Sequence, residues 1–207
     1  MSEPRAVATS TEEVVPGVRR WWVADERIGG GESDAYAVAD GDGRVVLIDP
    51  LPLADEPLAA LGPVAAIVLT AACHQRSAWR LRRLLGAPVH LPEGSRRTDE
   101  EPDARYREGD LLPGGLRAIR TPGPEQAHYA LLRERDPPVL FVADLVTRGP
   151  SGLAFVPARY HEDPAETRAS VRRLLEEPFA AICLAHGGPV PGDARAALRD
   201  LLAREPG

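Results

Sequence analysis

The sequence contains no lysine, only two cysteines and no long apolar run. All 25 basic residues are arginine, and the excess of acidic residues gives a formal net charge of −6. No dense basic patch stands out, which argues against a nucleic-acid-binding surface. No apolar stretch reaches the length of about 18 residues that a membrane helix needs. The N-terminus lacks the basic and then apolar pattern of a signal peptide. We therefore expect a cytoplasmic protein that contacts neither nucleic acid nor membrane.

The scarcity of cysteine excludes a disulfide framework. Cys183 lies in the apolar run 180–184, where a buried thiol is expected. Cys73 is different because His74 follows it directly. Abundant alanine, glycine and proline, with arginine in place of lysine, indicate a GC-rich bacterial genome and say nothing about function.

The chain has 207 residues, of which 43% are hydrophobic and 27% are charged. These values are typical of one globular domain. We predict a flexible N-terminus over residues 1–12 and a single domain over residues 13–207. The sequence gives no indication of the oligomeric state.

Short apolar runs separated by turn residues predict strands, and apolar residues at helical spacing predict helices. The predicted strands are 18–23, 35–38, 44–48, 65–69, 88–91, 116–120, 130–133, 139–142 and 180–184. The predicted helices are 58–61, 77–85, 163–176 and 193–204. The charged segment 95–110 contains proline and few apolar residues, so we predict a loop. This pattern indicates an α/β fold.

Residues able to bind a metal follow three of the buried strands. Cys73 and His74 come soon after strand 65–69, Asp144 follows strand 139–142, and His186 follows strand 180–184. Ligand sites in α/β sheets lie beyond the carboxyl ends of strands. Cysteine, histidine and carboxylates are the usual zinc ligands. These segments therefore predict a metal site.

Five segments in this order resemble the metallo-β-lactamase superfamily over residues 17–190. They are Val46-Leu47-Ile48-Asp49, Ile67-Val68-Leu69-Thr70, Thr121-Pro122-Gly123, Val142-Ala143-Asp144 and Leu184-Ala185-His186-Gly187. The resemblance implies a four-layer αββα sandwich and a hydrolase-like protein. It also implies a cleft that takes a small-molecule substrate or ligand.

The chain departs from the family's His-x-His-x-Asp-His motif, and two alignments are open. The ungapped alignment places Ala71, Cys73, Gln75 and Arg76 at the motif positions. A deletion of two residues after Thr70 instead places Cys73-His74 at the Asp-His pair and keeps Leu81 of the next helix in phase. We prefer this second alignment. In both, Pro124 stands where the resemblance implies a further histidine ligand.

The second alignment removes every ligand of one metal position and keeps four candidates at the other. These four are Cys73, His74, Asp144 and His186, a set suited to one Zn²⁺, with Fe or Mn as alternatives. His74 and Asp144 are also the catalytic candidates. One hypothesis is a hydrolase whose metal activates water against an ester, thioester, lactone or phosphodiester. The other is a metal-free, non-catalytic relative that binds a small molecule or a protein partner, which the ungapped alignment favours.

Other residues are predicted near the cleft or in structural roles. Asp49 is expected to organise a loop beside the site. His128 is either a cleft residue or part of a strand surface, and His161 is a cleft candidate beside Asp163, which is expected to cap a helix. Arg76 is expected to be a surface or salt-bridged arginine. Segments 95–110 and 148–164 are expected to shape the pocket.

Overall fold

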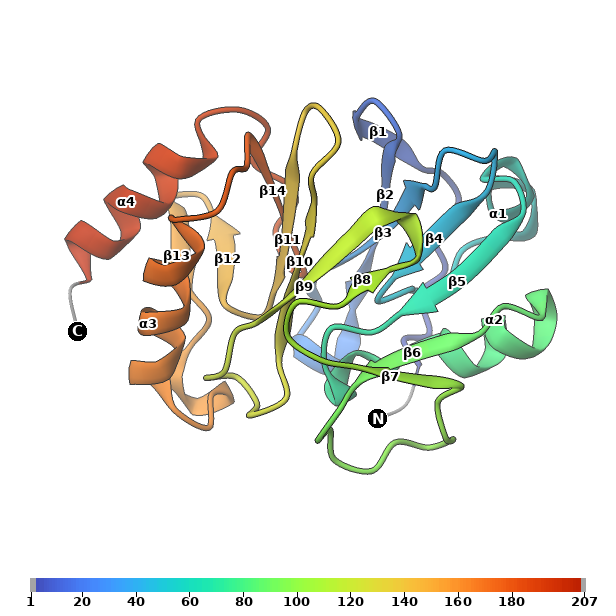
Figure 1. The fold of residues 1–207 in the computed structure, drawn as a ribbon, viewed down its shortest axis with the longest axis horizontal. Helices are drawn as coiled ribbons and strands as arrows, with labels where there is room; N and C mark the ends of the chain where they lie inside the picture. The colour runs from blue at the N-terminus through green and yellow to red at the C-terminus, as the bar shows by residue number, and fades with distance from the viewer. Residues whose placement is uncertain (1–2, 206–207) are drawn as a thin grey trace.

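In the computed structural model, which describes residues 3–205, two β-sheets pack face to face and carry helices on their outer faces (Figure 1). This arrangement is the predicted αββα sandwich, and the prediction of fold class is confirmed. None of the helices formed by these residues combines the length and the apolar character needed to cross a bilayer.

The first sheet has seven strands in sequence order. They are β1 (Glu12–Val15), β2 (Val18–Asp25), β3 (Gly31–Ala39), β4 (Val45–Ile48), β5 (Val64–Val68), β6 (Val89–Pro92) and β7 (Ala104–Tyr106). The strands from β1 to β4 are antiparallel, and those from β4 to β7 are parallel. The parallel pairs β4–β5 and β5–β6 are connected through α1 (Asp55–Ala60) and α2 (Ala78–Leu85), as crossover connections require.

The second sheet has the order β14-β11-β10-β9-β8. Its strands are β8 (Leu111–Leu112), β9 (Leu116–Arg120), β10 (Tyr129–Arg133), β11 (Val139–Ala143) and β14 (Ala181–Leu184). A separate hairpin is formed by β12 (Val146–Gly149) and β13 (Gly152–Phe155). The helices α3 (Pro164–Leu174) and α4 (Ala194–Arg204) lie on this side of the molecule. Only β11 and β14 run parallel in this sheet.

The alternation of side chains along the strands builds a core in layers. In β4, Val46 and Ile48 face the second sheet, whereas Val45 and Leu47 pack with the residues beneath α1 and α2. A third apolar cluster fills the space between the second sheet and the helices α3 and α4. The inner strands β4, β11 and β14 are thus buried on both faces, which explains why they read as continuous apolar runs.

Several hydrogen bonds connect the two sheets near the ends of their strands. The Tyr36 hydroxyl donates to the Leu184 carbonyl at 2.7 Å, and the Asp34 N–H donates to the Ala185 carbonyl at 2.8 Å. Between the segment after β5 and the start of β10, the Tyr129 N–H donates to the Thr70 carbonyl at 3.0 Å. The segments that carry the candidate ligands therefore meet at one edge of the sandwich.

The prediction of a loop over the whole of 95–110 is wrong. Residues 104–106 form β7, which pairs parallel with β6. Tyr106 is fully buried there, and its hydroxyl donates to the Leu69 carbonyl at 2.7 Å. This strand has a single large apolar residue among charged neighbours, so it produces no apolar run. The short strands β1, β8, β12 and β13 also went unpredicted.

The N-terminal segment has specific contacts with the domain. The Ala8 N–H donates to the Pro52 carbonyl at 3.0 Å, and the Ala8 carbonyl accepts from the Ala54 N–H at 2.9 Å. Glu3 accepts hydrogen bonds from the Ser77 hydroxyl and from Arg80. Residues 1–2 of the predicted flexible segment lie outside the described residues, and its flexibility stays a prediction.

Candidate metal centre

Asp49 organises the first half of the site. It directly follows β4 and has a φ of 47°, in the left-handed region that aspartate tolerates better than most residues. Its carboxylate accepts from the Thr70 N–H at 2.8 Å and from the Thr70 hydroxyl at 2.6 Å. The ends of β4 and β5 are thereby joined through one buried side chain.

His74 lies between two carboxylates. The short 3-10 turn Ala72–His74 brings its buried ring into the site. Its Nδ1 is 2.8 Å from Asp49 Oδ2, and its Nε2 is 3.0 Å from Asp144 Oδ2. A carboxylate that accepts from Nδ1–H fixes the ring and turns Nε2 toward the centre, as in many metal sites.

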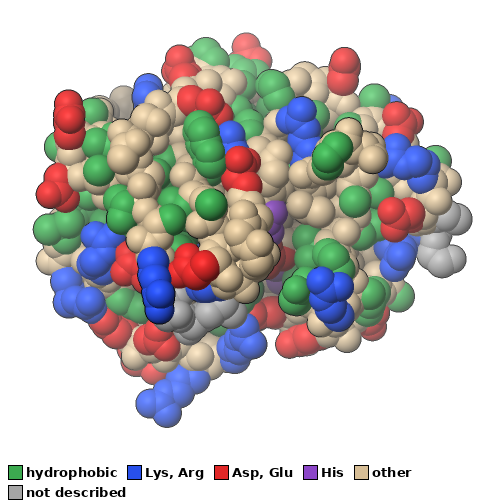
Figure 2. All heavy atoms as spheres, turned by 180° about the vertical axis from the view of Figure 1, so that it is seen from behind, with side chains coloured by type: hydrophobic (Ala, Val, Ile, Leu, Met, Phe, Trp, Pro, Cys, Tyr) green, Lys and Arg blue, Asp and Glu red, His purple; other side chains and the backbone are tan. Residues whose placement is uncertain are grey.

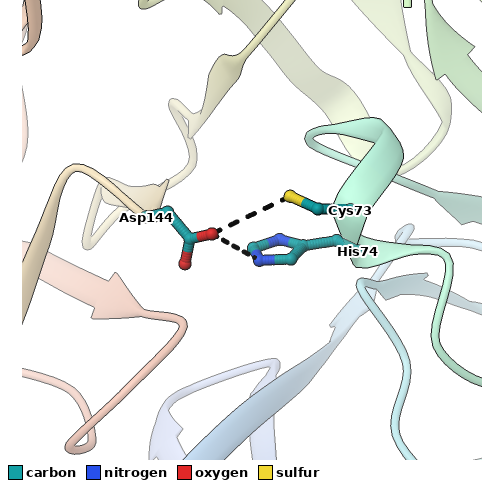
Figure 3. A group of neighbouring side chains, drawn as sticks. All are labelled: Cys73, His74 and Asp144. Atoms are coloured by element: carbon teal, nitrogen blue, oxygen red, sulfur yellow. Dashed lines mark hydrogen bonds and ion pairs between the residues drawn. The ribbon is translucent and has the colours of Figure 1, made fainter. Parts of the chain in front are cut away.

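Asp144 is the point at which the candidate ligands meet. It directly follows β11, and its carboxylate faces Cys73 and His74 (Figure 3). The Cys73 Sγ lies 3.9 Å from Asp144 Oδ2. On the other side, the His186 Nε2 lies 3.3 Å from Asp144 Oδ1. The His186 Nδ1 is 2.9 Å from the Glu32 carbonyl, so its proton is held there and Nε2 is directed at Asp144.

The donor atoms fit one metal ion. Cys73, His74 and Asp144 offer ligand atoms that all lie within 4.8 Å of one another. Two donors bound to a tetrahedral zinc at about 2.0–2.3 Å are roughly 3.3–3.8 Å apart. The observed separations of 3.0 and 3.9 Å fall close to this range. Among residues 3–205, the buried Asp144 Oδ1 accepts no hydrogen bond and is therefore available to a cation.

The centre combines a protonated His74 with the ionised carboxylates of Asp49 and Asp144. Burial alone would lower the pKa of His74, but Asp144 and Asp49 outweigh burial and raise this pKa to about 9. Burial would likewise raise the pKa of Asp144, but His74 and His186 hold it well below its ordinary value. Burial, together with the Asp144 and Glu125 carboxylates, raises the pKa of Cys73 well above its ordinary value. Without a cation, Cys73 is therefore a neutral thiol.

The remaining histidine candidates differ in position. His128 is fully buried, which rules out the strand-surface alternative. Its Nε2 accepts from the Asp144 N–H at 3.3 Å, so it lies directly behind the site. The His161 Nδ1 is 2.9 Å from the Thr167 hydroxyl, and burial lowers the pKa of His161 despite the nearby Asp144 charge. Asp163 caps α3 as predicted, accepting from the N–H groups of residues 165 and 166.

The prediction for Arg76 is wrong. Its side chain is buried, and its guanidinium donates to the backbone carbonyls of Asp34 at 2.7 Å and Asp49 at 3.2 Å. The residue has a φ of 32°, a sharp turn at the start of the helical segment. Arg76 thus lies inside the molecule and supports the ends of β3 and β4.

Glu125 is a site neighbour that the sequence did not reveal. It is buried, its carboxylate helps to raise the pKa of Cys73, and it forms an ion pair with Arg96 at 2.7 Å. The signal was its place directly after Pro124, where the resemblance implies a ligand. Arg96 belongs to the segment 95–110, which was expected to shape the pocket.

A surface hollow and a cavity lie near the loop after His186 (Figure 2). Figure 2 shows histidine side chains at the bottom of a hollow on one face of the molecule. A cavity of about 580 Å³ lies beside this loop, and its lining includes Glu32, Arg148, Gly187 and Gly188. Arg148 comes from the second segment that was expected to shape the pocket.

Comparison with known proteins identifies the family. The family model described as "Metallo-beta-lactamase superfamily" matches residues 21–204. The chain belongs to the metallo-β-lactamase superfamily. No curated protein sequence matches it significantly.

Solved structures of metallo-β-lactamase proteins share the fold. A metallo-beta-lactamase family protein from Thermus thermophilus is 21% identical, with a TM-score of 0.71 over 94% of this chain and 81% of that one. The DIM-1 metallo-beta-lactamase is 11% identical, with a TM-score of 0.76 over 97% and 98% of the two chains. TTHA1623, solved in a di-iron-bound form, is 28% identical, with a TM-score of 0.62 over 84% and 93%.

Membership of the metallo-β-lactamase superfamily confirms the resemblance read from the sequence. The superfamily consists in general of hydrolases that commonly bind zinc or iron. The cluster of Cys73, His74 and Asp144 lies at the ends of β5 and β11, where the resemblance implied ligands.

Proposed function

We propose that this protein is a hydrolase that uses one metal ion, held by Cys73, His74 and Asp144, with His186 facing the Asp144 carboxylate from the other side. The observation that supports this most is the convergence of a thiol and two imidazole Nε2 atoms on the single carboxylate of Asp144. The Nδ1 atoms of His74 and His186 each have a hydrogen-bond acceptor. The Nε2 atom of each ring therefore faces Asp144, either with its lone pair or with an added proton. One cation would satisfy the Cys73 thiol, the His74 Nε2 atom and the Asp144 carboxylate together.

Three protein ligands would leave one coordination position for a water. A catalytic zinc usually has three protein ligands and an open position. Here Cys73, His74 and Asp144 form the mutually close group, and His186 contacts it only through Asp144. The metal would lower the pKa of a bound water to about 7 and so supply hydroxide at neutral pH.

The residues of the chain would hold and orient the reactants. Asp49 keeps the His74 ring in place, and the Glu32 carbonyl does the same for His186. Asp144 would hold the ion through its carboxylate, and His186 Nε2 faces the Oδ1 atom of this carboxylate at 3.3 Å. The substrate would be an ester, thioester, lactone or phosphodiester.

Metal content is the direct test of this proposal. We expect elemental analysis to find about one metal ion per chain, and we expect chelation to remove hydrolysis of one of the four substrate classes. Adding Zn²⁺, Fe²⁺ or Mn²⁺ should restore the activity, and His186→Ala should reduce it. His90→Ala is the matched control, since His90 lies on β6 beside Asp103. Purified protein without metal, and without gain from any of the three ions, would contradict the proposal.

A second candidate function is binding without catalysis or metal. Its support is that protonated His74 between Asp49 and Asp144 satisfies the same carboxylates that a cation would satisfy. The absence of two leading histidines, with Ala71 and Ala72 after Thr70, also favours it. Such a protein would bind a small molecule or a protein partner in the same cleft.

The pH dependence of stability separates the two candidates. In metal-free protein the pKa of His74 rises from 6.5 to about 9 on folding. Its ion pairs therefore stabilise the fold fully below about pH 6.5, and this stabilisation is lost as the pH rises through about 9. We expect the free energy of unfolding in chelator to fall by about 2–3 kcal/mol between pH 6 and pH 10. A bound metal replaces the Nε2 proton and should remove this loss.

Urea unfolding across this pH range measures the effect. His74→Gln is the control, because it cannot titrate and should flatten the profile. A wild-type profile in chelator that matches His74→Gln would show that His74 does not carry the added proton.

A further inference from the structure

The backbone before Asp144 is held in an unusual conformation. Ala143, the last residue of β11, has a φ of 46°, in the left-handed region that residues other than glycine seldom adopt. The pairing register between β11 and β14 also shifts between Phe141 and Ala143. The direction in which the Asp144 carboxylate points therefore depends on contacts that hold this peptide, because the conformation is not one that alanine prefers.

His128 provides such a contact from the neighbouring strand. It immediately precedes β10, is fully buried, and accepts the Asp144 N–H at Nε2 over 3.3 Å. It contacts the main chain of Asp144, and the carboxylate remains turned to Cys73 and His74.

The ring of His128 is itself fixed. Its Nδ1 is 3.0 Å from the Thr121 carbonyl and 2.8 Å from the Thr121 hydroxyl. The carbonyl can only accept, so the proton is on Nδ1 and Nε2 is left as an acceptor. The Thr121 N–H also donates to the His128 carbonyl at 2.8 Å, which closes the loop between β9 and β10. The ring thus has one tautomer and one orientation.

We propose that His128 is a positioning residue, which holds the Asp144 peptide so that the Asp144 carboxylate faces His74, His186 and Cys73. Thr121 fixes the His128 ring, and the ring fixes the backbone of Asp144. His128 does not touch a metal or a substrate in this role. The test by metal affinity rests on the proposed function. The hydrogen bond from the Asp144 N–H to His128 Nε2 does not depend on that function.

Two matched variants test the role of the Nε2 acceptor. In His128→Gln the amide oxygen can reach the place of Nε2 and accept from Asp144. In His128→Asn the shorter amide can reach Thr121 but not Asp144. We expect His128→Asn to weaken Zn²⁺ binding by about 10- to 100-fold, the usual effect of losing a partner that orients a ligand, while His128→Gln stays near the wild-type affinity.

Zn²⁺ affinity is measured by competition with a chromophoric chelator, and circular dichroism checks that both variants fold. A merely structural role would move both affinities together. The proposal is overturned if folded His128→Asn binds Zn²⁺ as tightly as wild type, or if His128→Gln and His128→Asn lose the same affinity.

A measurement on the wild-type protein needs neither variant nor metal. Long-range ¹H–¹⁵N correlation spectra of the metal-free protein report which ring nitrogen carries the proton. We expect the Nδ1–H tautomer for His128, with Nε2 unprotonated. A proton on Nε2 would overturn the proposal, because that nitrogen could not accept from Asp144. Wild-type protein that binds no metal but shows the Nδ1–H tautomer would contradict the proposed function and leave this inference supported.

Discussion

Asp144→Asn is expected to bind Zn²⁺ at least about 100-fold more weakly than the wild-type protein, which is more than the loss expected from an outer partner of a ligand. The amide keeps the shape of the side chain but removes the charge that faces Cys73, His74 and His186. A neutral amide is also a poor zinc ligand beside thiolate, imidazole and carboxylate. Isothermal titration with Zn²⁺ into metal-free protein measures the change.

Asp42→Asn is the matched control for this variant. Asp42 lies in the exposed turn between β3 and β4, so the same chemical change there leaves the candidate centre intact. Wild-type zinc affinity in Asp144→Asn would show that the carboxylate is not a ligand. A loss of affinity in Asp42→Asn as large as that in Asp144→Asn would mean that net charge, and not the site, governs binding.

Asp49→Asn is expected to lower the free energy of unfolding by about 3 kcal/mol, because it removes one partner of a buried ion pair. Asparagine tolerates the left-handed backbone at this position, so the change isolates the carboxylate from the turn. The lost acceptor serves the Thr70 hydroxyl and His74 Nδ1, both of which are buried. Urea unfolding at pH 7 in chelator measures the stability.

The same variant has a second readout at the site. Once Asp49 no longer accepts from His74 Nδ1, the ring loses the contact that directs Nε2 at Asp144, and zinc binding should weaken by about 10- to 100-fold. Asp42→Asn again serves as the control and should change neither quantity by more than about 0.5 kcal/mol. A fully stable Asp49→Asn protein would contradict the organising role of Asp49.

The sequence predicted the elements whose apolar pattern is strong. The buried runs 65–69, 139–142 and 180–184 became β5, β11 and β14, and the segments after them carry the candidate ligands. These strands are covered on both faces, so they are apolar throughout and easy to identify. The order of the five short motifs then indicated the superfamily.

What escaped prediction depends on contacts between distant segments. Tyr106 is buried by pairing with β6 and by its bond to Leu69, neither of which its charged neighbours indicate. Arg76 reads as a surface residue until its backbone turn directs it inward to two carbonyls. Glu125 approaches Cys73 only because the loop after β9 passes the end of β5. Local sequence patterns do not indicate contacts between segments that are distant in the chain.

The candidate ligands come from opposite halves of the sandwich, which has a consequence for folding. Cys73 follows β5 of the first sheet, whereas Asp144, 71 positions later, follows β11 of the second. An ion bound between them would act as a cross-link across the two halves and would bind the docked state alone. It would raise the thermal midpoint in proportion to the logarithm of metal concentration. The unfolding temperature at increasing Zn²⁺ concentrations therefore measures how strongly the bound ion stabilises the contact between the two halves.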